Sequence, residues 1–246
     1  MPDSVATAPS GKGVLSRAIG IIVSPGATYK EVLRNPRPAG ILLLCCLVIA
    51  MATGLPQFTE RGQQAALDMN VQNIERFTGR PVTPEMYTQM ERQAAYGGYF
   101  AFVGVFVMMP VMSLIFTAVL WVVFNAILGG TAAFKSVLTV VTHSQVIGAL
   151  GAVAAAPIQY LQGTQNVAGP FNFGALLPVL DPGSFLALFL GGISVFVLWQ
   201  LAVCAIGLAV LYSRSAGRVT AGLTASYLVI AAVVTGVISS FMGGNR

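Results

Sequence analysis

The chain has 246 residues, of which 56% are apolar and only 9% carry a charge. A soluble globular domain carries about 25% charged residues, so this chain has too few hydrated groups to cover its own surface in water. With a mean hydropathy of +0.79, the composition excludes an ordinary soluble domain. It predicts an all-α protein that crosses a lipid bilayer.

The net charge of +5 is unevenly distributed along the chain. Five of the thirteen basic residues precede the first apolar run, namely Lys12, Arg17, Lys30, Arg34 and Arg37. Basic residues beside a span mark its cytoplasmic flank, where they face anionic lipid. We therefore expect this charge to serve a membrane surface, and we do not expect a nucleic-acid partner.

The residues before the first span divide into two parts. Residues 1–12 are small and polar, with Pro and Gly among them, and this composition predicts a disordered tail. They do not have the pattern of a cleaved signal peptide, so the first span is expected to be an uncleaved signal-anchor. Residues 13–37 are expected to form a cytoplasmic amphipathic segment.

An apolar stripe at helical spacing runs through that segment. It consists of Val14, Leu15, Ala18, Ile19 and Ile22. A second short helix is expected to begin at the cap-like pair Ser24-Pro25. Such stripes between basic residues are typical of helices on a membrane surface, but they also suit helices that pack beneath a bundle. The sequence leaves both alternatives open.

Five stretches are apolar enough to cross the bilayer, since a spanning helix needs about 20 such residues. They cover about residues 38–58, 99–128, 136–158, 185–211 and 220–241. The long second stretch contains Pro110, a possible kink, and is expected to end before Gly129-Gly130. Residues 38–246 are thus expected to form one five-span membrane domain.

The connections between the spans differ in character. The polar loop 59–93 has apolar residues at helical spacing and a helix start at Thr83-Pro84, so it is expected to be partly helical. The connector Gln159–Leu180 is rich in Gly, Asn and Gln, and a re-entrant path into the membrane is one interpretation of it. Asp181-Pro182 is expected to begin the fourth spanning helix.

Charge placement predicts the orientation of the spans. With the N-terminus inside, the cytoplasmic segments hold eight basic residues and the opposite segments hold five. Four of those five lie in the polar loop, where acidic residues outnumber them. Both short cytoplasmic turns carry Lys or Arg, as the positive-inside rule requires. We therefore expect a cytoplasmic N-terminus and an external C-terminus.

Four polar residues within the spans form the predicted intramembrane site: His143, Gln145, Asn125 and Gln200. His143 is the only histidine and stands among hydroxyl-bearing residues in the third span. An ionisable residue inside the membrane is a functional hypothesis. The alternative is that these side chains form structural hydrogen bonds between helices.

Small residues and cysteines are expected to serve packing. Two rows of small residues recur at every fourth position, Gly148, Ala152 and Ala156 in the third span and Ala232, Gly236 and Ser240 in the fifth. Such rows let helix backbones approach closely, within the bundle or against a partner helix. The cysteines are Cys45, Cys46 and Cys204. They lack the spacing of metal ligands, so no disulfide, metal or cofactor is expected.

Motifs of catalysis are missing from the sequence. It has no nucleophile elbow, no zinc-protease helix motif, no phosphate-binding loop and no pair of carboxylates within a span. One histidine does not supply both a base and a set of metal ligands. We therefore expect no enzymatic activity and assign no catalytic residue.

Three segments give the chain a family resemblance. They are SPGATYKEVLRNPRP (Ser24–Pro38), GGTAAFKSVLTVVTHSQV (Gly129–Val146) and FVLWQLAVCAIGLAVLYSRSAG (Phe196–Gly217). In their order and spacing they resemble the Yip family of small polytopic membrane proteins, whose eukaryotic members interact with Rab GTPases. The resemblance runs from about Ser16 to Met242, although the polar loop is larger than a minimal member would have.

The resemblance implies five spans, a cytoplasmic N-terminus and no catalytic activity. A bacterial member would lie in the inner (plasma) membrane, and a eukaryotic member would lie in an endomembrane. Since bacteria lack Rab GTPases, a role in vesicle traffic does not follow for a bacterial chain.

Two functions are open on this evidence. The leading hypothesis is a non-enzymatic scaffold, protein-interaction or bilayer-organising factor, whose partners are the lipid bilayer, other membrane proteins and further copies of itself. The rival is a small transporter or channel with a polar pathway near His143. The possible re-entrant connector supports the rival, whereas the odd number of spans and the lack of an evident inverted repeat oppose it.

Overall fold

This computed structural model describes residues 13–165, 169–175, 177 and 184–243. Its elements are helices, as the composition predicts. They are α1 (Val14–Val23), α2 (Pro25–Val32), α3 (Pro38–Gly54), η1 (Leu55–Phe58), α4 (Glu60–Thr78), α5 (Pro84–Ala94), α6 (Gly97–Trp121), η2 (Val122–Ile127), α7 (Phe134–Gln162), α8 (Phe185–Gly191), α9 (Val195–Leu211) and α10 (Ala216–Gly243). The expected disordered tail, residues 1–12, and the expected helix start at Asp181-Pro182 lie outside the described residues.

Within the described residues, four helical segments are long and apolar enough to cross a bilayer. They cover Pro38–Phe58, Gly97–Ile127, Phe134–Gln162 and Ala216–Ser240. In these segments the helix satisfies its own backbone hydrogen bonds, which is the condition for entering hydrocarbon. The chain is therefore an all-α integral membrane protein, with the amphipathic N-terminal helices and the partly helical polar loop that the sequence predicts.

The fourth expected span departs from the prediction, because it is broken into α8 and α9. The chain leaves the helix at Gly192 and forms an isolated bridge between Asn172 and Ser194. At this bridge the amide of Phe173 donates to the carbonyl of Ile193 at 2.9 Å. Backbone groups freed by the break are thus paired with the preceding connector.

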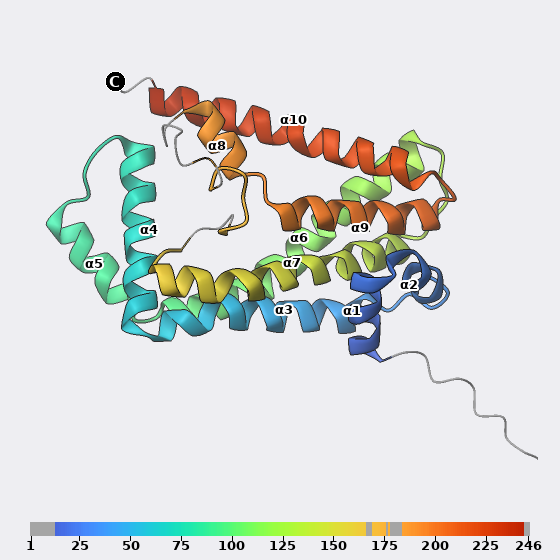
Figure 1. The fold of residues 1–246 in the computed structure, drawn as a ribbon, viewed down its shortest axis with the longest axis horizontal. Coiled ribbons are helices and arrows are strands. Elements are labelled where there is room, and N and C mark those ends of the chain that lie inside the picture. Colours follow the sequence, from blue (N-terminus) through green and yellow to red (C-terminus); the bar gives the residue numbers. More distant parts are fainter. Residues whose placement is uncertain (1–12, 166–168, 176, 178–183, 244–246) are drawn as a thin grey trace, which may run out of the picture.

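The helix α9 is shorter than a standard span. Its 17 residues rise about 25 Å at 1.5 Å per residue, against about 30 Å of hydrocarbon. It lies alongside α7 and α10 and contacts both (Figure 1). Its residues are as apolar as those of the long helices, so the count of five crossings stays a prediction that depends on α9.

The helix α7 lies at the centre of the bundle. It contacts α3, α6 and α9, and α1 touches it as well, whereas α10 packs mainly on α9 at the outside (Figure 1). Buried residues accordingly occur on several faces of α7, and they include Val137, Val140 and Ile147. It also extends further than expected, since it continues to Gln162 and ends at Gly163, whose φ is 64°.

The bundle has two distinct ends. At one, which we call the α1–α2 end, α1 runs across the direction of the long helices and α2 packs against α9 (Figure 1). At the other, the α4–α5 end, α4 also runs across that direction (Figure 1). Since α10 runs from the α1–α2 end to the α4–α5 end, the described chain begins and finishes at opposite ends of the bundle.

Local sequence signals explain how the elements at each end begin and stop. The Thr83 hydroxyl accepts a hydrogen bond from the amide of Met86 at 3.3 Å, so the expected cap before Pro84 is present. The second span passes into η2, a π-helical turn, and finishes just before Gly129, whose φ of 70° favours glycine. The break predicted at Gly129-Gly130 is confirmed.

Candidate functional site

The polar residues of the third span lie on α7 in the interior of the bundle. His143 is completely buried, and its Nδ1 lies 2.7 Å from the carbonyl oxygen of Thr139. Its Nε2 has no hydrogen-bond partner among the described residues. The ring centroid of Tyr29 lies 6.5 Å away. His143 therefore contacts its own helix and the N-terminal helix α2.

Tyr29 ties α2 to the middle of the bundle. Its side chain is completely buried, and its hydroxyl donates to the carbonyl oxygen of Val140 at 3.1 Å. The ring fits against Gly207 of α9, where an added Cβ would come within 2.8 Å of Tyr29 Cζ and 2.6 Å of Val140 Cγ1. Burial raises the pKa of the Tyr29 phenol well above its ordinary value. A glycine is thus needed where α2, α7 and α9 meet.

Gln145 faces α6 and has a different partner from His143. Its Nε2 donates to the Ser113 hydroxyl at 2.6 Å, and Ser113 in turn donates to the carbonyl oxygen of Met109 at 2.6 Å. Its Oε1 is buried and has no partner among the described residues. The pair joins α6 to α7 near the middle of both helices.

Asn125 lies in η2 at the α1–α2 end. Its Nδ2 donates to the carbonyl oxygen of Ala132 at 2.8 Å, and its Oδ1 accepts from the Tyr212 hydroxyl at 2.9 Å. The Tyr212 ring stacks on Phe124 with centroids 4.8 Å apart, and Arg214 donates to the carbonyl oxygen of Leu128 at 2.7 Å. Asn125 thereby connects the α6–α7 turn to the α9–α10 turn.

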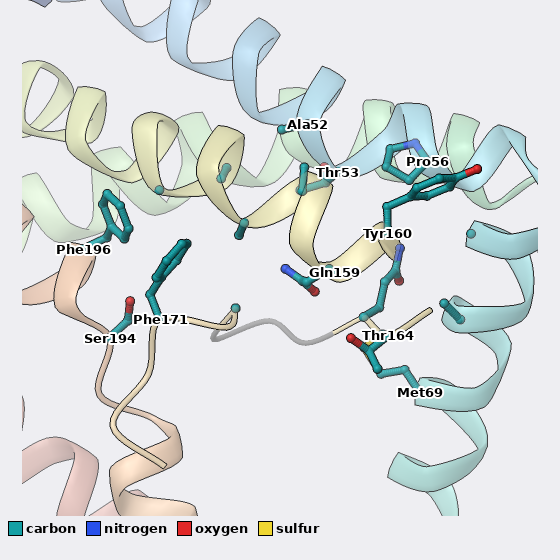
Figure 2. A pocket seen from close by; sticks show the side chains of 18 of the residues that line it. Ala52, Thr53, Pro56, Met69, Gln159, Tyr160, Thr164, Phe171, Ser194 and Phe196 are labelled. Atoms are coloured by element: carbon teal, nitrogen blue, oxygen red, sulfur yellow. The ribbon is translucent and has the colours of Figure 1, made fainter. Parts of the chain in front are cut away.

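A groove of about 800 Å³, which we call the α7 groove, opens between α3, α4, α7, α9 and the connector after α7. Its floor on α7 is made of small residues, namely Gly148, Gly151, Ala152, Ala155 and Ala156. Phe171 and Phe196 lie on one side of it, and Tyr160, Thr164 and Met69 lie on the other (Figure 2). Gln200 of α9 lies at its deep end, where an added Cβ on Gly148 would come within 2.7 Å of Gln200 Oε1.

A second groove of about 530 Å³ adjoins the first. Both are lined by Thr53, Gly148 and Gln200, and the second is also lined by Gln145. Met108, Met109 and Met112 of α6 lie along it. His143 lines neither groove.

The four residues of the predicted polar site are therefore divided between three places. Gln145 and Gln200 share the second groove, whereas His143 faces α2 and Asn125 lies at the end of the bundle. The predicted packing row Gly148, Ala152, Ala156 lines the α7 groove. Gly236 faces α8 with room to spare, since an added Cβ would lie 3.9 Å from the Phe185 ring. Gln145 and Asn125 thus form hydrogen bonds to other elements, whereas Gln200, Ala152 and Ala156 line the α7 groove.

Two residues of these sites were not selected from the sequence. Tyr29 looked like one more apolar residue of a short helix, and only the fold places it against Val140, 111 positions away. Arg61 looked like one cation of a polar loop, and only the fold places it at the α7 groove. Its guanidinium donates to the carbonyl oxygen of Leu161 and lies 5.7 Å from the centroid of the Tyr160 ring.

The N-terminal helix α1 has two apolar faces with different surroundings. Ile21 is completely buried, and Val14, Ala18 and Ile22 pack against the core. The opposite face leaves Leu15 67%, Ile19 62% and Val23 77% exposed. The stripe predicted from the sequence is therefore divided. One side of it packs against the bundle, and the other side is exposed and available to a membrane surface.

The described residues contain no group of three or more His, Cys, Asp or Glu side chains that could hold a metal ion. All three cysteines are buried and unpaired with one another, and the Cys46 thiol donates to the Met109 sulfur at 3.5 Å. They pack within the bundle, as their positions in apolar runs predict.

Comparison with protein-family models gives a match over most of the chain. The model of the Yip1 domain matches residues 19–238, which is nearly the whole chain. A search of curated proteins and a search of solved structures each found no match. The three segments on which the resemblance was based, Ser24–Pro38, Gly129–Val146 and Phe196–Gly217, all fall inside the matched range. They carry Tyr29, the turn bonded by Asn125, and Gly207 with Tyr212. The chain belongs to the Yip1-domain family of membrane proteins.

Proposed function

We propose that this chain is a non-enzymatic membrane scaffold that organises the bilayer through its α1–α2 end. The observation that carries the proposal is the exposed apolar face of α1, formed by Leu15, Ile19 and Val23. The helix lies across the end of the bundle (Figure 1), which is the orientation of a helix in the plane of a membrane surface. A helix of this kind buries its apolar face at the boundary between headgroups and acyl chains.

The surrounding charge supports insertion into an anionic leaflet. The α1–α2 end carries seven basic residues and one acidic residue among the described ones; the basic residues are Arg17, Lys30, Arg34, Arg37, Lys135, Arg214 and Arg218. The α4 and α5 segment, residues 59–94, carries four basic and five acidic residues. Basic residues favour the cytoplasmic side. The proposal therefore places the N-terminus in the cytoplasm and α1 in the cytoplasmic leaflet.

The fixed position of α1 makes it suited to shaping the membrane. Ile21 of α1 is buried and Tyr29 of α2 is bonded to α7, so the inserted face is coupled to the spanning helices. Such a wedge expands one leaflet relative to the other. Many copies of the chain, in contact with each other or with other membrane proteins, would add these effects over an area of membrane.

The test is to reconstitute the full chain and its Ile19→Glu variant in vesicles of phosphatidylglycerol and phosphatidylcholine. Burying an Ile side chain is worth about 1.5–3 kcal/mol. The equilibrium constant for insertion of α1 into lipid should therefore be at least about tenfold lower in the variant. We expect smaller vesicles with the wild type than with the variant, measured by electron cryomicroscopy. Ile19→Leu keeps the apolar face and should behave as the wild type.

Equal vesicle sizes with the wild type and Ile19→Glu would refute the proposal.

The transporter alternative is favoured by the two adjoining grooves and by the unpartnered Oε1 of Gln145. It predicts solute flux through the same vesicles, with loss of flux in Gln145→Leu. A scaffold predicts no flux in either case.

A further inference from the structure

The α7 groove is a space that helix packing has left open. On the floor, α7 presents glycine and alanine at five positions over two turns and more. Two of these positions are closely packed, since an added Cβ would come within 2.7 Å of Gln200 Oε1 at Gly148 and within 2.7 Å of the Phe196 ring at Gly151. At Ala152, Ala155 and Ala156 the small side chains leave room instead of bringing a neighbouring helix closer.

The position of the groove decides what fills it. It runs from Gly148 and Gln200, in the middle of α7 and α9, to Arg61 and Met69 on α4 at the α4–α5 end. Since α7 is long and apolar enough to cross the bilayer, its middle is the part expected in hydrocarbon, whereas α4 runs across the end of the bundle (Figure 1). The groove, of about 800 Å³, is partly open to its surroundings, and its apolar lining favours an apolar occupant over water. Apolar cavities stay dry and accept apolar molecules.

The mouth of the groove carries a positive charge. Arg61 uses one guanidinium nitrogen for the carbonyl oxygen of Leu161 and lies over the Tyr160 ring. Both contacts are with uncharged groups, so within the described part of the chain no carboxylate neutralises this cation. Gln57 and Thr164 line the same mouth. A guanidinium with donors to spare is a typical ligand for a phosphate group.

We propose that the α7 groove binds a phospholipid, with an acyl chain along the alanines of α7 and the phosphate against Arg61. The volume of the groove falls in the range of about 300–1,000 Å³ that is usual for ligand sites. The apolar floor and the cation at the mouth are arranged in the same order as the chain and the headgroup of a lipid in its leaflet. This inference goes beyond the proposed function, because it concerns the α4–α5 end and does not depend on α1.

The test uses the full chain purified in detergent and stripped of lipid. Native mass spectrometry then measures the binding of added phosphatidylglycerol. Ala152→Leu fills the groove and should lower binding at least about tenfold. Ala154→Leu is the matched control, since Ala154 lies on the same helix, is partly exposed and lines neither groove. It adds the same three carbons outside the groove and should leave binding unchanged.

The contribution of the phosphate is tested on α4. Arg61→Gln should lower the binding of phosphatidylglycerol about tenfold and leave the binding of diacylglycerol, which lacks a phosphate, unchanged. Arg76→Gln removes a charge from the same helix outside the groove and should have no effect. Displacement of phosphatidylglycerol by inorganic phosphate alone would show a simple anion site and would overturn the proposal.

Unchanged phosphatidylglycerol binding in both Ala152→Leu and Arg61→Gln would also overturn it. If Ala152→Leu does not fold, Ala156→Leu fills the same groove one turn further along α7 and gives the same comparison. Ile19→Glu should bind phosphatidylglycerol as the wild type does. Failure of the proposed function at α1 and failure of the lipid site are therefore distinguishable.

Discussion

Tyr29 is the single residue that best represents the packing of the N-terminal helices. Its hydroxyl reaches the backbone of α7, and its ring fills the space that Gly207 leaves on α9. In Tyr29→Phe the ring remains and the hydrogen bond is lost. The variant should therefore be less stable by about 0.5–1.5 kcal/mol at neutral pH, measured by unfolding in detergent.

The stability difference between wild type and Tyr29→Phe should also depend on pH. An unfolded tyrosine ionises near pH 10, whereas burial raises the pKa of Tyr29 in the folded chain. The stabilisation from Tyr29 is thus complete below about pH 10 and is lost as the pH rises further. The difference in the free energy of unfolding between wild type and Tyr29→Phe should therefore decrease above pH 10. Tyr87→Phe, on exposed α5, is the control and should leave the free energy of unfolding unchanged. A difference between wild type and Tyr29→Phe that stays constant with pH would contradict the burial of the phenol.

The location of His143 in a span is predictable from the sequence, but its neighbours on other helices are not. Its location inside a span and its place among the hydroxyl-bearing residues Thr139, Thr142 and Ser144 follow from the sequence alone. Its closest aromatic neighbour, Tyr29, does not, because that contact depends on α2 folding back onto α7. A polar residue inside a span is visible in the sequence, but the side of the helix it faces depends on how the bundle packs.

At the scale of elements, the turns at the α1–α2 end behave as one unit. Asn125 bonds Tyr212 and Ala132, and so links the end of the second long helix to the turn after α9. Asn125→Ala and Tyr212→Phe should each destabilise the chain. Because both remove the same hydrogen bond, their combined effect should fall short of the sum by about 0.6 kcal/mol.

The control for that cycle combines Tyr212→Phe with Gln145→Ala. Gln145 bonds Ser113 and has no contact with Tyr212 among the recorded hydrogen bonds, so these two effects should add. Additive effects for Asn125 and Tyr212 would mean that the two turns are not coupled. The quantity measured is the free energy of unfolding of the four variants of each cycle.

Most elements could be predicted from the sequence, because long apolar runs and capping residues are local signals. The start of α5 at Pro84 and the break at Gly129-Gly130 are examples. The break between α8 and α9 was not predicted, because residues 185–211 carry no charge and are long enough for one span, although the pair Gly191-Gly192 marks the position of the break. It is accompanied by pairing between Ser194 and Asn172, a contact between distant segments. The groove beside Ala152 was equally hidden, because a row of small residues predicts close packing as readily as open space.

At the scale of the whole molecule, charge and shape are divided between two ends. The α1–α2 end is strongly basic and presents an apolar helix face, whereas the α4–α5 end is nearly neutral and carries the mouth of the α7 groove. This division gives each leaflet a different contact with the protein. The proposed scaffold function and the proposed lipid site belong to opposite sides of one bundle.

The orientation of that bundle depends on whether α9 crosses the membrane. With α3, α6, α7, α9 and α10 all crossing, the two termini lie on opposite sides. If α9 did not cross, four spans would return the C-terminus to the side of the N-terminus. The number of crossings is therefore decided by the location of the two termini.

The most direct measurement is a pair of topology reporters, one fused before Met1 and one after Arg246, each read in intact cells. A fluorescent protein that matures only in the cytoplasm and a phosphatase that is active only outside it give opposite signals. With five crossings, we expect fluorescence at the N-terminus and phosphatase activity at the C-terminus. Fluorescence from the C-terminal fusion, with no phosphatase activity there, would contradict five crossings.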